Sequence, residues 1–102
     1  MSHSELLIAA VLEEHYLSLE QLSALCRVEP DWILRHIDDG LLTAFQAESG
    51  DWQFSYSEFT RARRMLSIER NFDAVPELAA LVADLQEELD ALRHQLRHAP
   101  LG

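Results

Sequence analysis

Hydrophobic positions recur three and four residues apart along most of the chain, which is the spacing of one face of an α-helix. In the sequence LSLEQLSALCRV, residues 17–28, Ser18 precedes Gln21 by three positions, the arrangement of a capping box. The apolar positions of this segment share one helical face: Leu19, Leu22, Leu25 and Cys26. A first helix is therefore predicted here.

The next apolar stripe lies in VEPDWILRHIDDGLL, residues 28–42. Pro30 suits the first position of a helix, and Gly40 suits its C-terminal end, where a positive φ is common. The apolar face continues through Trp32, Ile33, Ile37 and Leu41. Two short helices separated by a tight turn predict a helix-turn-helix.

Two segments favour extended structure instead. The run ELLIAAVL, residues 5–12, is continuously apolar, and we interpret it as an edge strand, although periodicity alone does not separate strand from helix. The segment 43–55 places ESGD between short pieces that contain Phe45, Trp52 and Phe54. It predicts a two-stranded wing.

A third helix is predicted over residues 55–72, with Ser55 or Ser57 as its cap. It carries half of the arginines, namely Arg61, Arg63, Arg64 and Arg70. Such a cluster indicates either a phosphate site or a solvated face that pairs with Glu58 and Glu69. We expect the solvated face, because four arginines do not outweigh the charge of the whole chain.

The last helix has the most regular pattern. Its apolar residues are spaced alternately three and four apart, as in the a and d positions of a heptad repeat: Val75, Leu78, Val82, Leu85, Leu89, Leu92 and Leu96. Pro76 fits an early helical position and Pro100 a stop. Because Ala79 and Leu81 widen this seam, we expect the first turns to pack on the body and the later turns to project.

A projecting seam can fold back, pair with a second copy, or hold a different protein. Three heptads are marginal as an isolated coiled coil, so we expect a homodimer that the globular body also supports. The predicted dimer seam consists of Val82, Leu85, Leu89, Leu92 and Leu96. In a parallel dimer Glu88 faces Arg93 of the partner, but one exposed ion pair does not decide orientation.

Composition limits the partners. The chain has 102 residues, 48% of them hydrophobic, which fits one domain or one domain with an appended helix. Eighteen Asp and Glu stand against eight Arg and no Lys, for a formal net charge of -10. A field of this sign disfavours nucleic acids and anionic membranes and favours a basic protein surface.

The single cysteine, Cys26, excludes an internal disulfide and is interpreted as a small core residue in a protein of a reducing compartment. The apolar run 6–12 is too short to span a bilayer and lacks the flanks of a signal peptide. A cytoplasmic location is expected.

No catalytic constellation is visible, since the sequence lacks a phosphate loop, a nucleophile elbow, an HExxH motif and a cysteine cluster. His94 and His98 stand four residues apart, but no third ligand is close in sequence, so an ordinary exposed pair is expected. We therefore expect no enzyme, no cofactor and no metal site.

The order of helix-turn-helix, wing, arginine-bearing helix and heptad helix resembles MerR-type regulators from about Tyr16 to Leu96. The expected fold is mainly α: a winged helix-turn-helix body over residues 1–72, with a short β wing, and a coiled-coil-type helix over 73–99, in one domain. DNA-binding members of that class place basic residues in the second helix and wing. This chain has acids there instead: Asp31, Asp38, Asp39, Glu48 and Asp51.

A closer resemblance is to the chaperone modulator family CbpM, whose members are small and MerR-like. It rests on four motifs: GLL at residues 40–42, WQF at 52–54, RARR at 61–64 and the leucine-rich helix at 78–96. The resemblance implies an inhibitor that binds the J-domain of a DnaJ-like, CbpA-type co-chaperone and blocks its work with Hsp70. The alternative is a MerR-like transcriptional regulator that binds DNA.

The family motifs cover mainly core positions, so the contact residues are a hypothesis from charge alone. The candidate partner-binding residues are Glu13, Glu14, Asp31, Trp32, His36, Asp38 and Asp39. Trp32 has two interpretations, as a core anchor or as an exposed aromatic contact.

Overall fold

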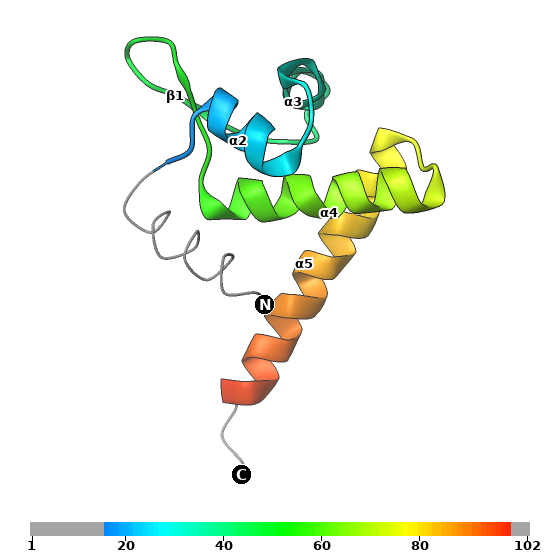
Figure 1. Ribbon diagram of the computed structural model, residues 1–102. Coiled ribbons are helices and arrows are strands. Elements are labelled where there is room, and N and C mark those ends of the chain that lie inside the picture. Colours follow the sequence, from blue (N-terminus) through cyan, green and yellow to red (C-terminus); the bar gives the residue numbers. More distant parts are fainter. Residues whose placement is uncertain (1–15, 99–102) are drawn as a thin grey trace.

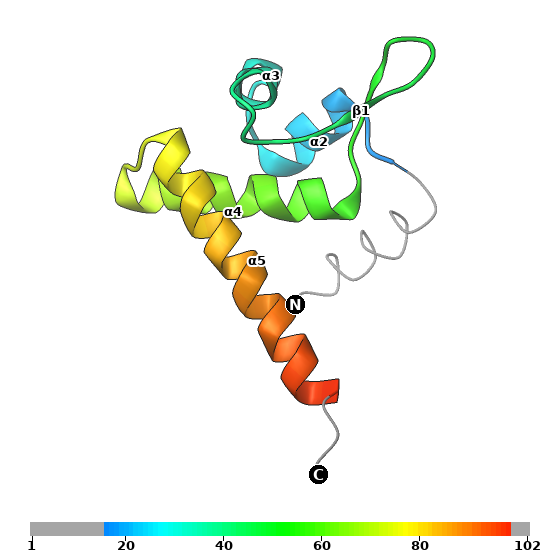
Figure 2. The ribbon, with the colours of Figure 1, turned by 180° about the vertical axis from the view of Figure 1, so that it is seen from behind.

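A computed structural model describes residues 16–98, and this part of the protein is mainly helical. Its elements are α2 (Leu19–Cys26), α3 (Pro30–Asp38), β1 (Phe45–Gln46), β2 (Trp52–Gln53), α4 (Tyr56–Phe72) and α5 (Pro76–His98). In two opposite views, α2, α3 and the hairpin lie on one side of α4, while α5 crosses α4 and extends away from it (Figures 1 and 2). The predicted strand at residues 5–12 and the stop at Pro100 lie outside the described residues.

Within residues 16–98, no helix combines the length and apolar character needed to cross a membrane.

Helix α2 begins as predicted. The Ser18 side chain accepts a hydrogen bond from the Gln21 backbone, and the Gln21 side chain accepts one from the Ser18 backbone. Leu22 and Cys26 are buried, whereas Leu25, on the same predicted apolar face, is 42% exposed. The inward face of α2 includes Ser23 instead, which is buried. The Ser23 hydroxyl has a hydrogen-bond partner there, because it donates to the Leu19 carbonyl at 2.8 Å.

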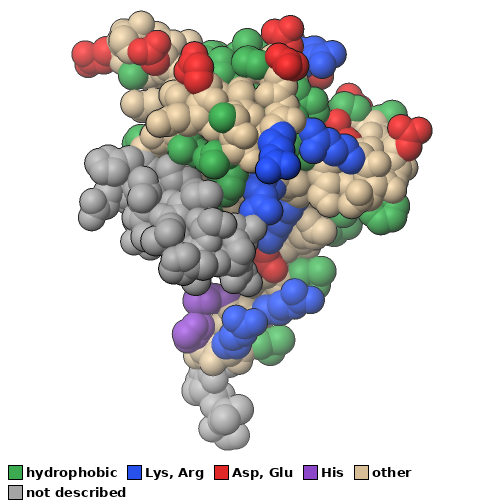
Figure 3. All heavy atoms as spheres, viewed as in Figure 1, with side chains coloured by type: hydrophobic (Ala, Val, Ile, Leu, Met, Phe, Trp, Pro, Cys, Tyr) green, Lys and Arg blue, Asp and Glu red, His purple; other side chains and the backbone are tan. Residues whose placement is uncertain are grey.

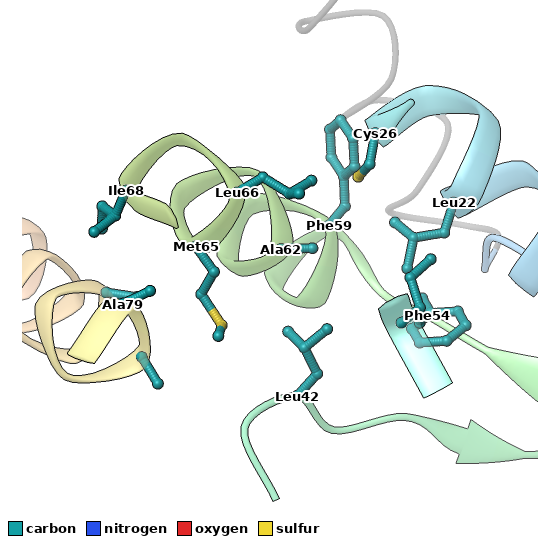
Figure 4. Close-up of a cluster of buried hydrophobic side chains, with 13 residues drawn as sticks. Leu22, Cys26, Leu42, Phe54, Phe59, Ala62, Met65, Leu66, Ile68 and Ala79 are labelled. Atoms are coloured by element: carbon teal, nitrogen blue, oxygen red, sulfur yellow. The ribbon is translucent and has the colours of Figure 1, made fainter. Parts of the chain in front are cut away.

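Helix α3 begins at Pro30 and ends before Gly40, both as predicted. Gly40 has φ +74°, in the left-handed region that glycine adopts without steric cost. The chain then turns back under the helix, where the backbone N–H groups of Leu41 and Leu42 both donate to the His36 carbonyl. This turn directs Leu42 into the core (Figure 4).

The hairpin is shorter than the sequence pattern suggests. β1 and β2 are antiparallel strands of two residues each, with Phe45 opposite Gln53 and Gln46 opposite Trp52. Gly50, at φ +91°, closes the turn. Phe54 continues past the hairpin, pairs with Leu17 and is fully buried, so the segment leading into α2 is held against the start of α4.

The core is assembled on α4. Ser55 caps this helix in a capping box with Glu58, which settles the choice between Ser55 and Ser57. Side chains from α2, α3, the hairpin end and α5 converge on it (Figure 4). The buried hydrophobic residues are Leu22, Cys26, Ile33, Leu42, Phe54, Phe59, Ala62, Met65, Leu66, Ile68, Ala79, Ala80 and Ala83.

Helix α5 packs on α4 through alanines rather than through its leucine seam. Ala79, Ala80 and Ala83 are buried, whereas Leu81 is 55% exposed. The expectation that Leu81 helps the first turns of α5 pack on the body was therefore wrong. The same expectation for Ala79 is confirmed. Small side chains allow two helices to approach closely, so the body holds α5 without using the leucines.

Candidate partner-binding surface

The outer face of α3 is acidic. Asp31, Asp38 and Asp39 are all exposed, and none of them forms an ion pair with another residue of 16–98. Figure 3 shows acidic side chains over the end of the molecule that carries α3 and the hairpin. These carboxylates therefore face solvent without a paired cation of the described chain. We call Asp31, Asp38 and Asp39 the acidic face.

The acidic face is held in place by the opposite side of the same helix. Ile33 is fully buried in the core, and Ile37 packs against its edge. Because the apolar residues fix the rotation of α3, Asp31 and Asp38 must point outward. The face is thus a consequence of the helical period, as the sequence predicted.

His36 belongs to the inner side of α3, which corrects the expectation that it flanks the partner surface. The residue is only 4% exposed. Its Nε2 lies 3.0 Å from Glu69 Oε2 on α4, and its Nδ1 lies 2.6 Å from the Trp32 carbonyl. His36 lies four residues, or about one helical turn, after Trp32 on α3. It therefore shares the inner side of the helix with Trp32, although it is close to Asp38 and Asp39 in sequence.

Trp32 combines the two interpretations left open by the sequence. Its ring stacks on the His36 ring with centroids 3.7 Å apart, and its indole N–H donates to Glu69 Oε1 at 3.3 Å. The side chain is nevertheless only half-buried. Trp32 therefore anchors α3 to α4 and still offers part of its ring to solvent. Glu13 and Glu14 lie outside the described residues.

Two arginines of α4 face α5, which corrects the expected pairing with Glu58 and Glu69. Arg61 binds Asp84 at 2.7 Å and Glu87 at 3.0 Å, and Arg64 binds Asp90. Glu58 is occupied instead by the Ser55 backbone and by the Thr43 hydroxyl. Partners on a later helix cannot be read from spacing within α4.

Arg61 also reaches the segment after α3. Its Nε donates to the Leu41 carbonyl at 2.8 Å. Burial alone lowers the pKa of Arg61, but the hydrogen bonds to Asp84 and Glu87 outweigh this, so its pKa lies above the usual value. One side chain thus connects α4, α5 and the segment that follows α3.

The leucine seam is exposed on the described part of α5. Leu78, Leu85, Leu89 and Leu92 are each about half exposed, and Leu96 is 76% exposed, while Val82 is partly buried against the core. The predicted seam is therefore an open apolar stripe on a helix that the alanines already hold.

Neither a reactive thiol nor a metal cluster appears in the described part of the chain. Cys26 is buried, and burial raises its thiol pKa from 9.0 to about 11, although Arg63 and Arg70 lower it in part. Within residues 16–98 no three potential ligands converge on a metal position. His94 and His98 lie side by side, with ring centroids 4.3 Å apart.

Comparison of the chain with protein-family models, curated proteins and solved structures finds no match.

Proposed function

We propose that this protein is a winged helix-turn-helix modulator that binds the J-domain of a DnaJ-like, CbpA-type co-chaperone and prevents its work with Hsp70. The observation that carries the proposal is the acidic face, Asp31, Asp38 and Asp39, on a helix whose other side is locked to the core. In a DNA-binding protein the same position would carry cations.

Charge supports a basic protein partner over a polyanion. The resemblance to the CbpM family implies a J-domain with a basic helix that engages Hsp70. Three open carboxylates on one rigid helix would speed the encounter with such a helix and fix its orientation. Inhibition then needs only occupation of the surface that Hsp70 requires.

The proposal includes a homodimer through the leucine seam. Leu85, Leu89 and Leu92 are each about half exposed on α5, a helix that crosses α4 and extends away from it (Figure 1). A stripe of exposed leucines in heptad register is the surface that a second helix covers in a coiled coil. This leaves the acidic face free for the partner, since it lies on α3.

Reversal of charge on the acidic face tests the function. In the double variant Asp38→Arg/Asp39→Arg, association with a purified CbpA-type J-domain should slow at least tenfold at low salt, and its salt dependence should weaken. Stopped-flow fluorescence measures the rate, and J-domain-stimulated Hsp70 ATPase measures inhibition.

A matched control reverses two exposed acids of α5, Glu77→Arg/Glu88→Arg, with the same change of net charge. It should slow association less than the α3 variant. Equal rates for the two variants would assign the effect to net charge alone and remove the acidic face from the interface.

The second candidate is a MerR-like DNA-binding regulator, favoured by the order of two short helices and a hairpin. Its difficulty is the acidic face, which would approach phosphates. Titration with duplex DNA at low salt separates the candidates, because specific DNA binding has nanomolar affinity and a steep salt slope.

A further inference from the structure

Three exposed arginines surround one hollow at the junction of α2, α3 and α4. Arg27 ends α2, Arg35 lies on α3, and Arg70 lies near the end of α4. The hollow has a volume of about 580 Å³, and Trp32 and Ser23 also line it. We call it the arginine groove. Figure 3 shows a group of arginine side chains in the middle of the molecule, with another arginine at its acidic end.

These three arginines differ from Arg61 and Arg64 because no carboxylate within residues 16–98 pairs with them. Arg70 donates one hydrogen bond to the Arg27 carbonyl at 3.2 Å, and Arg35 donates one to the Asp31 carbonyl at 3.4 Å. A guanidinium has five N–H donors, so most of them remain open to a ligand. The chain has eighteen Asp and Glu and only eight Arg, so three neighbouring arginines without a carboxylate partner are unexpected.

The C-terminal end of α2 explains part of this arrangement. Cations stabilise the carbonyl end of a helix, and Arg70 binds the carbonyl of Arg27 there. That interaction does not account for Arg35, which extends from a different helix. Glu29 is the one carboxylate that lines the groove, so positive charge dominates it.

We propose that the arginine groove binds a short acidic peptide segment. Arginine is suited to this ligand because its planar fork donates two parallel hydrogen bonds to one carboxylate. Three guanidiniums from three helices present donors from several directions. The half-buried Trp32 ring supplies an apolar surface for the methylene groups of a glutamate.

A neighbouring hollow decides between a peptide and a nucleic acid. Asp31 and Asp38 line it together with Arg35, so the acidic face begins where the arginine groove ends. A long polyanion would have to pass these carboxylates well within a Debye length. A segment of a few acidic residues fits the groove without reaching them.

The groove also deepens the proposed function and, in this respect, rests on it. A partner with an acidic segment beside its basic helix would place that segment at Arg35 when the basic helix lies on the acidic face. Recognition of both charges in sequence would fix the direction in which the partner helix lies, because a reversed helix would meet like charges on both sites.

The experiment uses fluorescein-labelled hexaglutamate and the full chain at low salt, with fluorescence anisotropy as the readout. We expect saturable binding that weakens as salt is added. The triple variant Arg27→Gln/Arg35→Gln/Arg70→Gln should weaken binding at least tenfold. Arg35→Gln alone should weaken it severalfold, and it removes only one contact, to a backbone carbonyl.

The matched control is Arg93→Gln/Arg97→Gln, which removes two cations from the exposed end of α5. It should leave hexaglutamate binding within twofold of the original protein. No binding by the original protein, equal loss in the control, or tighter binding of duplex DNA than of hexaglutamate would each overturn the proposal.

The same assay distinguishes this site from the proposed function. Asp38→Arg/Asp39→Arg should weaken J-domain binding but leave or strengthen hexaglutamate binding. If the protein binds hexaglutamate but not the J-domain, the arginine groove is supported and the proposed function is rejected. If it binds the J-domain but not hexaglutamate, the proposed function is supported and the groove is rejected.

Discussion

The imidazole of His36 on α3 and the carboxylate of Glu69 on α4 meet at 3.0 Å in a nearly enclosed position. On its other side, His36 Nδ1 lies 2.6 Å from the Trp32 carbonyl oxygen. Glu69 accepts the Trp32 indole N–H through Oε1 and contacts His36 Nε2 through Oε2. This pair joins the helix that carries the acidic face to the helix that carries the core.

Removal of Glu69 should loosen that connection. Glu69→Ala leaves the His36 Nε2 and the Trp32 indole N–H without their partner, and we expect a loss of about 2 kcal/mol in the free energy of unfolding. Urea denaturation followed by tryptophan fluorescence measures it. The control Glu88→Ala removes an exposed carboxylate and should change stability by less than about 0.5 kcal/mol. Similar losses in both variants would contradict the structural role of Glu69.

Arg61 should stabilise the junction between α5 and the body. In Arg61→Ala the Leu41 carbonyl loses a partly buried donor, and Asp84 and Glu87 lose their shared cation. Because both carboxylates are partly exposed, we expect a total loss of about 1 to 2 kcal/mol. Arg97→Ala, near the end of α5, is the control for urea unfolding and should be close to neutral. An Arg61 variant as stable as the control would refute this assignment.

The buried thiol predicts a dependence on alkaline pH. Burial raises the pKa of Cys26 from 9.0 to about 11, so the unfolded chain releases this proton at a lower pH than the native protein. The native state then binds more protons than the unfolded state, and stability falls as pH rises from 9 to 11, by about 2 to 3 kcal/mol. Below pH 9 this contribution is constant.

Cys26→Ala isolates that effect. Urea unfolding at pH 8 and at pH 10.5 should show a smaller fall in stability for the variant than for the original protein, whatever their difference at pH 8. Parallel falls would show that groups other than Cys26 cause the alkaline loss.

The leucine seam predicts self-association. Leu89→Lys places a charge in the middle of the stripe, and we expect the dimer to dissociate while the circular dichroism spectrum keeps its helical form. Sedimentation equilibrium measures the mass. Ala91→Lys adds the same charge at an exposed position off the seam and should remain dimeric. A monomeric original protein at micromolar concentration would exclude this dimer.

The charges of α5 predict an antiparallel pair. Its acids lie between Glu77 and Asp90, and its arginines, Arg93 and Arg97, follow them. Antiparallel helices place the basic end of one copy beside the acidic part of the other and set Leu78 opposite Leu96. In a Cys26→Ala background, a mixture of Leu78→Cys and Leu96→Cys proteins should form mixed disulfides under oxidation. Cross-linking of Leu78→Cys only with itself would indicate parallel helices.

Local features of the fold were predictable because neighbouring residues determine them. Ser18 with Gln21, Pro30 and Gly40 define helix ends through interactions within a few positions. The outward position of Asp31 and Asp38 follows from the period of the helix. These features need no knowledge of how the helices pack.

Contacts between elements were not predictable in the same way. Arg61 could have paired with several acids, and only the crossing of α4 and α5 selects Asp84 and Glu87. His36 is polar and lies close to aspartates in sequence, yet Glu69, thirty-three positions away, makes its burial favourable. The arginine groove likewise combines residues from three helices.

Because of the alanine face of α5, packing of this helix on its own chain does not depend on the proposed association with a second copy. Ala79, Ala80 and Ala83 attach the helix to its own chain, and the leucines stay exposed, where the proposed second copy would bind. Loss of the second molecule therefore exposes no part of the core. Dilution should yield a folded single chain first, and denaturant should unfold that chain in a later, concentration-independent transition.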